Sequence, residues 1–110
     1  MTTSGLDLTI AAARFCGLKW AYSAIYQGIV TLNDYGNTAK QFSPLNDLND
    51  LDVVVCRLIE SGFEICIWEA ETGSHFSISD DEQFNKTGAY PAEYPRSILE
   101  LAAELHEGKG

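Results

Sequence analysis

Residues 63–70, Phe-Glu-Ile-Cys-Ile-Trp-Glu-Ala, constrain the fold more than any other stretch of this chain. Side chains alternate across a β-strand, so a strand here has two apolar faces: Phe63, Ile65 and Ile67 on one side, and Cys66, Trp68 and Ala70 on the other. A strand that is apolar on both faces is typical of a sheet covered on both sides. We therefore expect a sheet that is buried between two layers of helix.

Three segments have the periodicity of amphipathic helices: residues 4–16, about 48–60 and about 95–107. Ser4 or Thr3 is a suitable cap for the first helix, and Gly17 a suitable stop. The second helix has the best signals. Asn46 or Asp47 can cap it, Ser61-Gly62 ends it, and its apolar stripe is Leu51, Val54, Val55 and Leu58. The third helix has Pro95 in its first turn, where a missing N–H costs nothing.

The remaining apolar segments predict strands. Residues 18–33 alternate aromatic and β-branched side chains with polar ones, and a turn or bulge is expected near Gln27-Gly28. Residues 38–44 are expected to add a short extended piece. Gly73 suits the turn of an antiparallel hairpin over 63–79, with its half-polar second strand nearer the sheet edge. Residues 80–93 are predicted to be a loop.

These elements predict one domain over residues 1–110, with its core at about 5–107. The expected class is α+β, in three layers. It is a helix–sheet–helix sandwich with three helices and a mainly antiparallel sheet of about four strands.

The charge balance limits the partners of this chain. Sixteen acidic residues face seven basic ones, giving a net charge of −9, which repels nucleic acid and anionic membranes and favours a basic partner. No secretory signal or apolar run of membrane-spanning length is present, so a cytoplasmic protein is expected. The odd number of cysteines argues against a disulfide framework, and the pattern predicts that all three are small buried hydrophobes: Cys16, Cys56 and Cys66.

Several segments resemble a known family. Phe42-Ser43-Pro44-Leu45-Asn46-Asp47 leads into the second helix, an acidic-apolar helix ends at Gly62, and a hairpin follows. The last helix opens with Tyr94-Pro95-Arg96-Ser97-Ile98-Leu99, and the first contains Leu6-Asp7-Leu8-Thr9-Ile10. Over roughly residues 5–105 the chain resembles the phage ABA sandwich domain family of small phage and prophage proteins. The resemblance implies helix, sheet and helix layers and a phage origin, and it supplies no catalytic residues.

The leading functional hypothesis is a non-enzymatic protein that binds another protein. Two roles are expected for such a protein in a phage: inhibition of host defence, for example as an anti-CRISPR protein that presents carboxylates where a nuclease expects phosphates, or another phage accessory role. The acidic cluster at Asp47–Asp52 is explained by helix capping and the helix dipole, so no metal site or cofactor is predicted. The acidic residues least needed as caps are the predicted partner surface: Asp80, Asp81 and Glu82, then Glu69 and Glu71.

Other hypotheses remain open. Trp20, Tyr22, Tyr26 and Trp68 are candidates to line a small-molecule pocket, although aromatic residues at strand spacing are more often core. A free sheet edge is a possible homodimer contact. Enzymatic activity is not expected, because the chain lacks a Gly-rich phosphate loop and metal-ligand spacing. His75 beside Cys66 is the best catalytic candidate that remains.

Overall fold

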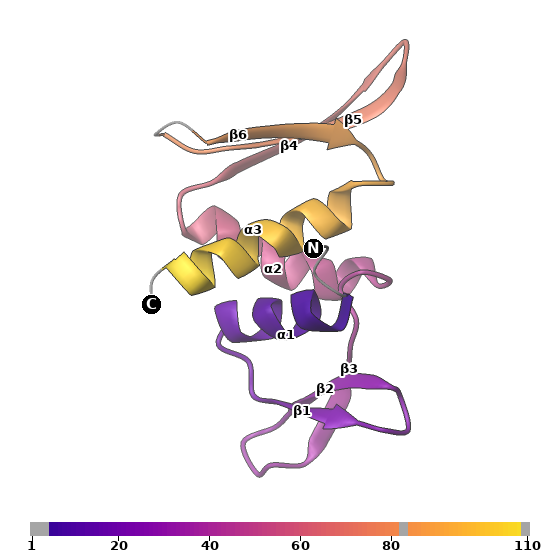
Figure 1. Ribbon diagram of the computed structural model, residues 1–110, viewed down its shortest axis with the longest axis vertical. Helices are drawn as coiled ribbons and strands as arrows, with labels where there is room; N and C mark the ends of the chain where they lie inside the picture. Colours follow the sequence, from indigo (N-terminus) through magenta and orange to yellow (C-terminus); the bar gives the residue numbers. More distant parts are fainter. Residues whose placement is uncertain (1–4, 82–83, 109–110) are drawn as a thin grey trace.

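The computed structural model describes residues 5–81 and 84–108. In this part of the chain, three helices form a central layer between two three-stranded antiparallel sheets (Figure 1). The molecule is longest in the direction in which the layers are stacked, with extents of 46 × 29 × 28 Å. The predicted α+β class with three helices and antiparallel strands is confirmed. The strands form two sheets, which lie on either side of the helices.

The first sheet is a meander of β1 (Trp20–Ser23), β2 (Gly28–Leu32) and β3 (Thr38–Phe42), in that spatial order. The β1–β2 turn ends at Gln27, which has a φ of +52°, so the predicted turn before Gly28 is confirmed. The register of β2 against β3 shifts between Thr31 and Leu32. This irregularity lies later in the chain than the expected bulge.

The second sheet contains β4 (Glu64–Ala70), β5 (Gly73–Ser79) and β6 (Asn85–Ala89), with β5 in the centre. The β4–β5 hairpin confirms the predicted turn, in which Gly73 has a φ of +118°. The prediction of a loop over 80–93 is wrong for β6, and β4 rather than β5 is therefore an edge strand. Strand β6 could not be predicted from its sequence, because residues 85–89 do not alternate apolar with polar side chains. The strand forms through backbone pairing with β5.

The helices are α1 (Gly5–Phe15), α2 (Leu48–Glu60) and α3 (Tyr94–Gly108). Helix α2 begins after Asp47, whose Oδ1 accepts a hydrogen bond of 2.9 Å from the Asn49 N–H, as the capping pattern predicts. Gly17 and Gly62 follow α1 and α2 with φ values of +70° and +104°, a conformation that glycine adopts without strain. The predicted caps Thr3 and Ser4 lie outside the described residues.

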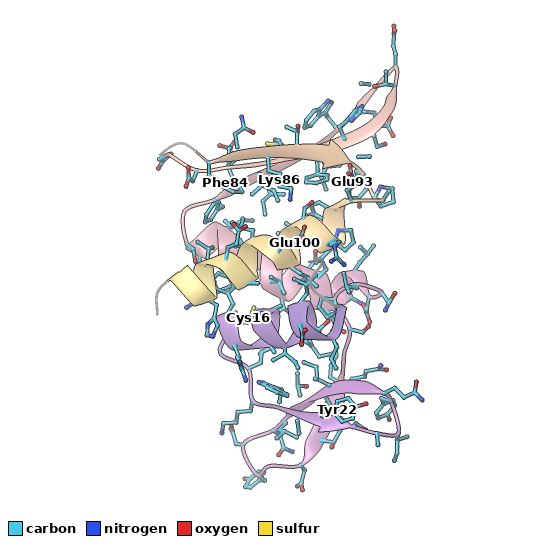
Figure 2. The ribbon with its side chains drawn as sticks, in the orientation of Figure 1. Cys16, Tyr22, Phe84, Lys86, Glu93 and Glu100 are labelled. Carbon is cyan, nitrogen blue, oxygen red and sulfur yellow. The ribbon has the colours of Figure 1, made fainter. Side chains whose placement is uncertain are left out.

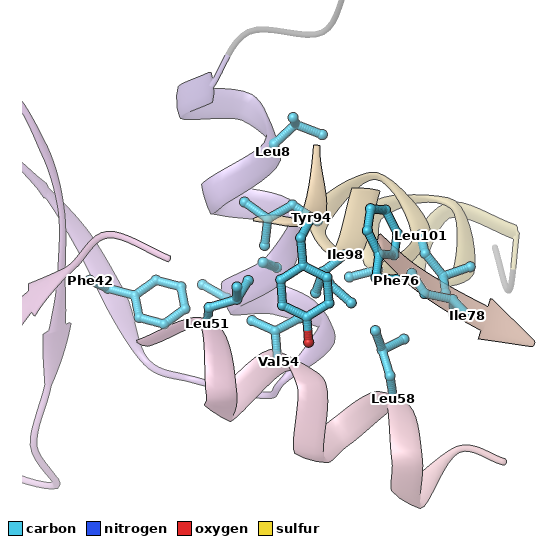
Figure 3. Close-up of a cluster of buried hydrophobic side chains, with 14 of the residues drawn as sticks. Leu8, Phe42, Leu51, Val54, Leu58, Phe76, Ile78, Tyr94, Ile98 and Leu101 are labelled. Atoms are coloured by element: carbon cyan, nitrogen blue, oxygen red, sulfur yellow. The ribbon is translucent and has the colours of Figure 1, made fainter. Parts of the chain in front are cut away.

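The main hydrophobic core lies in the helix layer and against the inner faces of both sheets (Figure 3). Helix α2 contributes the predicted Leu51, Val54 and Leu58, and β5 contributes the predicted inward pair Phe76 and Ile78. Further fully buried side chains come from α1, β2 and α3: Leu8, Ile29, Ile98 and Leu99. One core therefore joins two sheets that do not touch each other.

The expectation that strand 63–70 is covered on both faces is wrong. Cys66, Trp68 and Ala70 are exposed on the outer face of the second sheet, and on the inner face only Ile65 of β4 is half-buried. The reason is the order of the layers, because helices cover only the inner face of each sheet. The same order overturns the prediction for the cysteines: Cys56 and Cys66 are exposed, and Cys16 is half-buried.

Candidate functional site

The β4–β5 hairpin extends beyond the helix layer (Figure 1). Strand β6 pairs with β5 only from Ser79 back to His75, so the last pairs of the hairpin, Glu69 with Ser74 and Ala70 with Gly73, continue past it. We call residues 67–72 the hairpin end. Its side chains have little of the protein to pack against, so the hairpin end is presented to solvent on several sides.

Two large apolar side chains lie at the base of the hairpin end, on opposite faces of β4. Ile67 is 48% exposed on the inner face, and Trp68 is 43% exposed on the outer face. The Trp68 ring lies 5.9 Å from the ring of His75, centroid to centroid, on the neighbouring strand. His75 Nε2 is also 2.8 Å from Thr72 Oγ1, and this contact fixes the imidazole beside the indole.

The hairpin end also carries uncompensated negative charge. Glu69 and Glu71 are exposed, and within 5–81 and 84–108 neither forms an ion pair. Residues 63–81 contain five carboxylates and no Lys or Arg. Exposed apolar groups beside unpaired carboxylates form a surface that suits an apolar and basic partner.

The other predicted partner residues lie at the opposite end of the hairpin. Asp80 follows Ser79, which pairs with Glu64, whereas Glu69 pairs with Ser74, five residues further along β4. Asp80 is one position beyond Ser79 and thus six positions from Glu69, so at about 3.4 Å per residue the two acidic groups are about 20 Å apart. Asp81 is exposed, and Glu82 lies outside the described residues. The structure therefore divides the predicted surface in two.

Asp80 has a structural role as well. Its Oδ1 accepts a hydrogen bond of 3.0 Å from the Phe84 N–H and so closes the connection between β5 and β6. The Phe84 ring, in turn, packs edge-on against Phe63 with 5.7 Å between the ring centroids. We therefore place the hairpin end ahead of Asp80 and Asp81 as the candidate binding surface.

The acidic cluster of α2 divides into residues with different roles. Asp47 caps the helix, as predicted, and Asp52 is exposed. Asp50, which the sequence suggests is a charge near the helix dipole, is instead 2% exposed. Its carboxylate is 2.6 Å from Lys40 Nζ and accepts a hydrogen bond of 2.8 Å from the Ser43 N–H. The hydrogen bond that the Lys40 ammonium donates to the Asp50 carboxylate raises the pKa of Lys40. These contacts connect β3 to α2, so the role of Asp50 is to stabilise the fold.

Cys16 and Cys56 line a shallow cavity of about 480 Å³ beside α2, together with Asp52, Arg57 and Glu60. The Cys16 Sγ lies 3.9 Å from the carbonyl oxygen of Val53, and burial raises the pKa of this thiol to about 11. A thiol with a raised pKa is a poor nucleophile near neutral pH. No group of three metal-ligating side chains occurs in the part of the chain that the structure describes.

A second cavity, of about 310 Å³, lies between the start of α1 and the first sheet. Among the described residues, none that lines this cavity is charged, although the protein carries a net charge of −9. The polar side chains of the lining are those of Thr9, Tyr26, Gln27, Gln41, Ser43 and Asn46. Of the four predicted pocket aromatics, only Tyr26 lines this cavity. Trp20 packs under Arg14, and Trp68 is in the other sheet.

A third cavity, of about 210 Å³, lies between β6 and α3, and its lining includes the residues of an ion-pair network, among them Lys86 and Glu100 (Figure 2). Glu100 lies 3.7 Å from Lys86 Nζ and 3.7 Å from Arg96 Nε, and Glu93 accepts a hydrogen bond of 2.8 Å from the Ala89 N–H. These contacts attach β6 to α3. The two cations are therefore engaged by this network.

The comparisons with known proteins give no relative for this chain: no family model, no curated protein and no solved structure matches it. No helix in residues 5–81 and 84–108 has the length and apolar character needed to cross a membrane.

Proposed function

We propose that this chain acts by binding another protein through the hairpin end. The observation that carries the proposal is the exposure of Ile67 and Trp68 on opposite faces of an element that extends beyond the helix layer. On a projecting hairpin these two side chains can contact a partner from both faces of the strand, and tryptophan is enriched among residues that dominate binding.

The charge of the hairpin end defines the class of partner. Glu69 and Glu71 favour a partner with a basic surface, and the net charge of −9 accelerates the encounter with such a partner. Nucleic acid is itself negatively charged, so it would be repelled by this surface. The proposed partner is therefore a protein with a basic surface.

A narrower proposal is that the chain is a phage or prophage protein that inhibits host defence by occupying the basic nucleic-acid-binding surface of a nuclease complex. Its support is the resemblance to the phage ABA sandwich domain family and the acidic charge. Asp80 and Asp81 provide a second group of carboxylates about 20 Å from the first, and a long basic groove would contact both groups.

The test is affinity capture from bacterial lysate with three baits, followed by mass spectrometry. The baits are the natural chain, the variant Glu69→Lys/Glu71→Lys, and the control Asp34→Lys/Glu104→Lys, which changes the net charge equally at exposed sites outside both groups of carboxylates. We expect the natural chain and the control to retain the same protein and the hairpin variant to lose it. Equal retention by all three baits, or equal loss in both variants, would contradict the proposed surface.

A second candidate function is the binding of a small uncharged polar molecule in the cavity beside Tyr26. The observation that favours it is the neutral lining of this cavity in an acidic protein. Nuclear magnetic resonance titration with neutral polar compounds tests it, with Gln41→Ala as the variant. Shifts confined to the cavity and lost in this variant support a site, and their absence across the compounds rejects it.

A further inference from the structure

Strand β4 has an open edge. It is one of the two outer strands of the second sheet, and among the described residues only β5 pairs with it. Natural proteins protect such edges with proline, lysine, bulges or a covering segment. Residues 64–70 contain no proline and no lysine, the β4–β5 register is regular over all seven pairs, and most of the strand is exposed.

The hairpin geometry shows which backbone groups face this edge. Only Glu71 and Thr72 connect the paired residues Ala70 and Gly73, and the pair that closes such a two-residue loop is hydrogen bonded. Hydrogen-bonded and non-hydrogen-bonded pairs then alternate along the strands. The peptide groups of Ile65, Ile67 and Glu69 are therefore directed away from β5, available to a further strand.

The charge around the edge indicates what kind of strand fits. Glu64, Glu69 and Glu71 lie on or next to β4, and no Lys or Arg occurs from residue 63 to residue 81. A second copy of the chain would bring the same carboxylates to the edge and a further net charge of −9. A basic segment would bring the opposite charge, which favours association.

We propose that β4 accepts an extended basic segment of a partner protein as an additional strand of the second sheet. Backbone hydrogen bonds to Ile65, Ile67 and Glu69 hold the added strand, as in other cases of strand addition. In a segment that alternates apolar and basic residues, the apolar side chains pack beside Trp68 on the outer face, and the cations lie on the other face, beside Glu69. This inference rests on the proposed protein-binding function and specifies how the partner binds.

Hydrogen exchange measured by nuclear magnetic resonance tests the proposal with a defined probe. The probe is the capped peptide Lys-Val-Lys-Val-Lys-Val-Lys, and its control is the same peptide methylated on every backbone nitrogen, which keeps the charge and removes the donors. At a peptide concentration tenfold above its Kd, we expect exchange of the Ile65, Ile67 and Glu69 amides to slow about tenfold. The Cys66 and Trp68 amides face β5 and should change less.

Three results would overturn the inference. The first is equal protection by the methylated peptide, and the second is absence of protection at these three amides. The third is protection that grows with protein concentration when no peptide is added, because it makes a second copy the occupant of the edge. If the peptide fails but the Glu69→Lys/Glu71→Lys variant still loses its partner from lysate, protein binding stands and strand addition is wrong.

Discussion

Asp50 connects parts of the molecule that are separated in sequence. Its carboxylate lies in α2 and contacts Lys40 of β3 and the backbone of Ser43. A buried carboxylate is tolerated only when it is paired and hydrogen bonded, and both conditions hold here. The stability of the join between the first sheet and the helix layer should therefore depend on this one residue.

The variant Asp50→Ala should lower the free energy of unfolding by about 2 kcal/mol, because it removes a hydrogen bond to a charged acceptor and leaves the Ser43 N–H without its partner. Urea unfolding measures the effect. Asp52→Ala removes an exposed carboxylate from the same helix and should stay within about 0.5 kcal/mol of the natural chain. Equal effects of the two variants would refute the role of Asp50.

The three cysteines should differ in their reaction with iodoacetamide. Only the thiolate reacts, and burial raises the pKa of Cys16 to about 11 while the side chains of Cys56 and Cys66 are exposed. We expect Cys16 to be alkylated last at about pH 8, as followed by peptide mass spectrometry over time. Early labelling of Cys16 in the folded protein would be inconsistent with its half-buried position.

At the scale of single elements, the short strand β6 depends on close packing against β5. A Cβ atom added at Gly88 would lie 2.8 Å and 2.9 Å from two ring carbons of the buried Phe76 and 3.0 Å from Glu93 Oε2. These distances are shorter than van der Waals contact, and the ring is packed edge-on against Tyr94. Gly88 therefore allows β6 to pair with β5 directly over the core.

Gly88→Ala should destabilise the protein by about 1–3 kcal/mol, the usual cost of overpacking a core. The matched control is Gly28→Ala in the other sheet, where an added Cβ would meet nothing closer than a backbone oxygen at 3.8 Å. Thermal unfolding of both variants gives the comparison. A Tm for Gly88→Ala equal to that of Gly28→Ala would mean that the contact with Phe76 relaxes freely.

The whole molecule has one helix layer that supports two sheets. The sheets share no strand, and their inner faces contact the same core (Figure 3). Each sheet contains one tryptophan, Trp20 in β1 and Trp68 in β4. The two indoles are therefore separate reporters of the two sheets.

We expect the sheets to unfold together, because neither can keep its inner face covered once the helices separate. The single-tryptophan variants Trp68→Phe and Trp20→Phe report the first and the second sheet in urea. Leu58→Ala, at a fully buried position, should lower the unfolding midpoint of both reporters by a similar amount, corresponding to about 2–5 kcal/mol. Its neighbour Ile59 is 53% exposed, so Ile59→Ala should cost less. Separate midpoints for the two reporters would show that the sheets are independent.

Alkaline pH should weaken the whole fold. Burial raises the pKa of Cys16 to about 11 and that of Tyr94 to about 12, so the folded state holds protons that the unfolded state releases at lower pH. Stability therefore falls as the pH rises above about 9. Unfolding midpoints at several pH values check this decline, and Tyr94→Phe should make it shallower. A constant midpoint up to about pH 11 would contradict it.

The sequence by itself determined the local elements. The cap at Asp47, the stops at Gly17 and Gly62, and the turn at Gly73 depend on neighbouring residues, and the periodicity of α2 and α3 defines their buried faces. Local backbone preferences and amphipathic spacing act over a few residues, so they can be read from the chain directly.

Only the tertiary structure decided which apolar residues are covered. Strand β4 is apolar on both faces, yet Trp68 is exposed because the helices lie between the sheets. The polar segment at 85–89 becomes a strand because β5 offers it a partner. Three further features also depend on how the elements are arranged in space: Asp50 is buried, Glu69 is separated from Asp80, and β4 has an open edge. Burial and pairing depend on what lies opposite a residue in space, and the order of the layers supplies that partner.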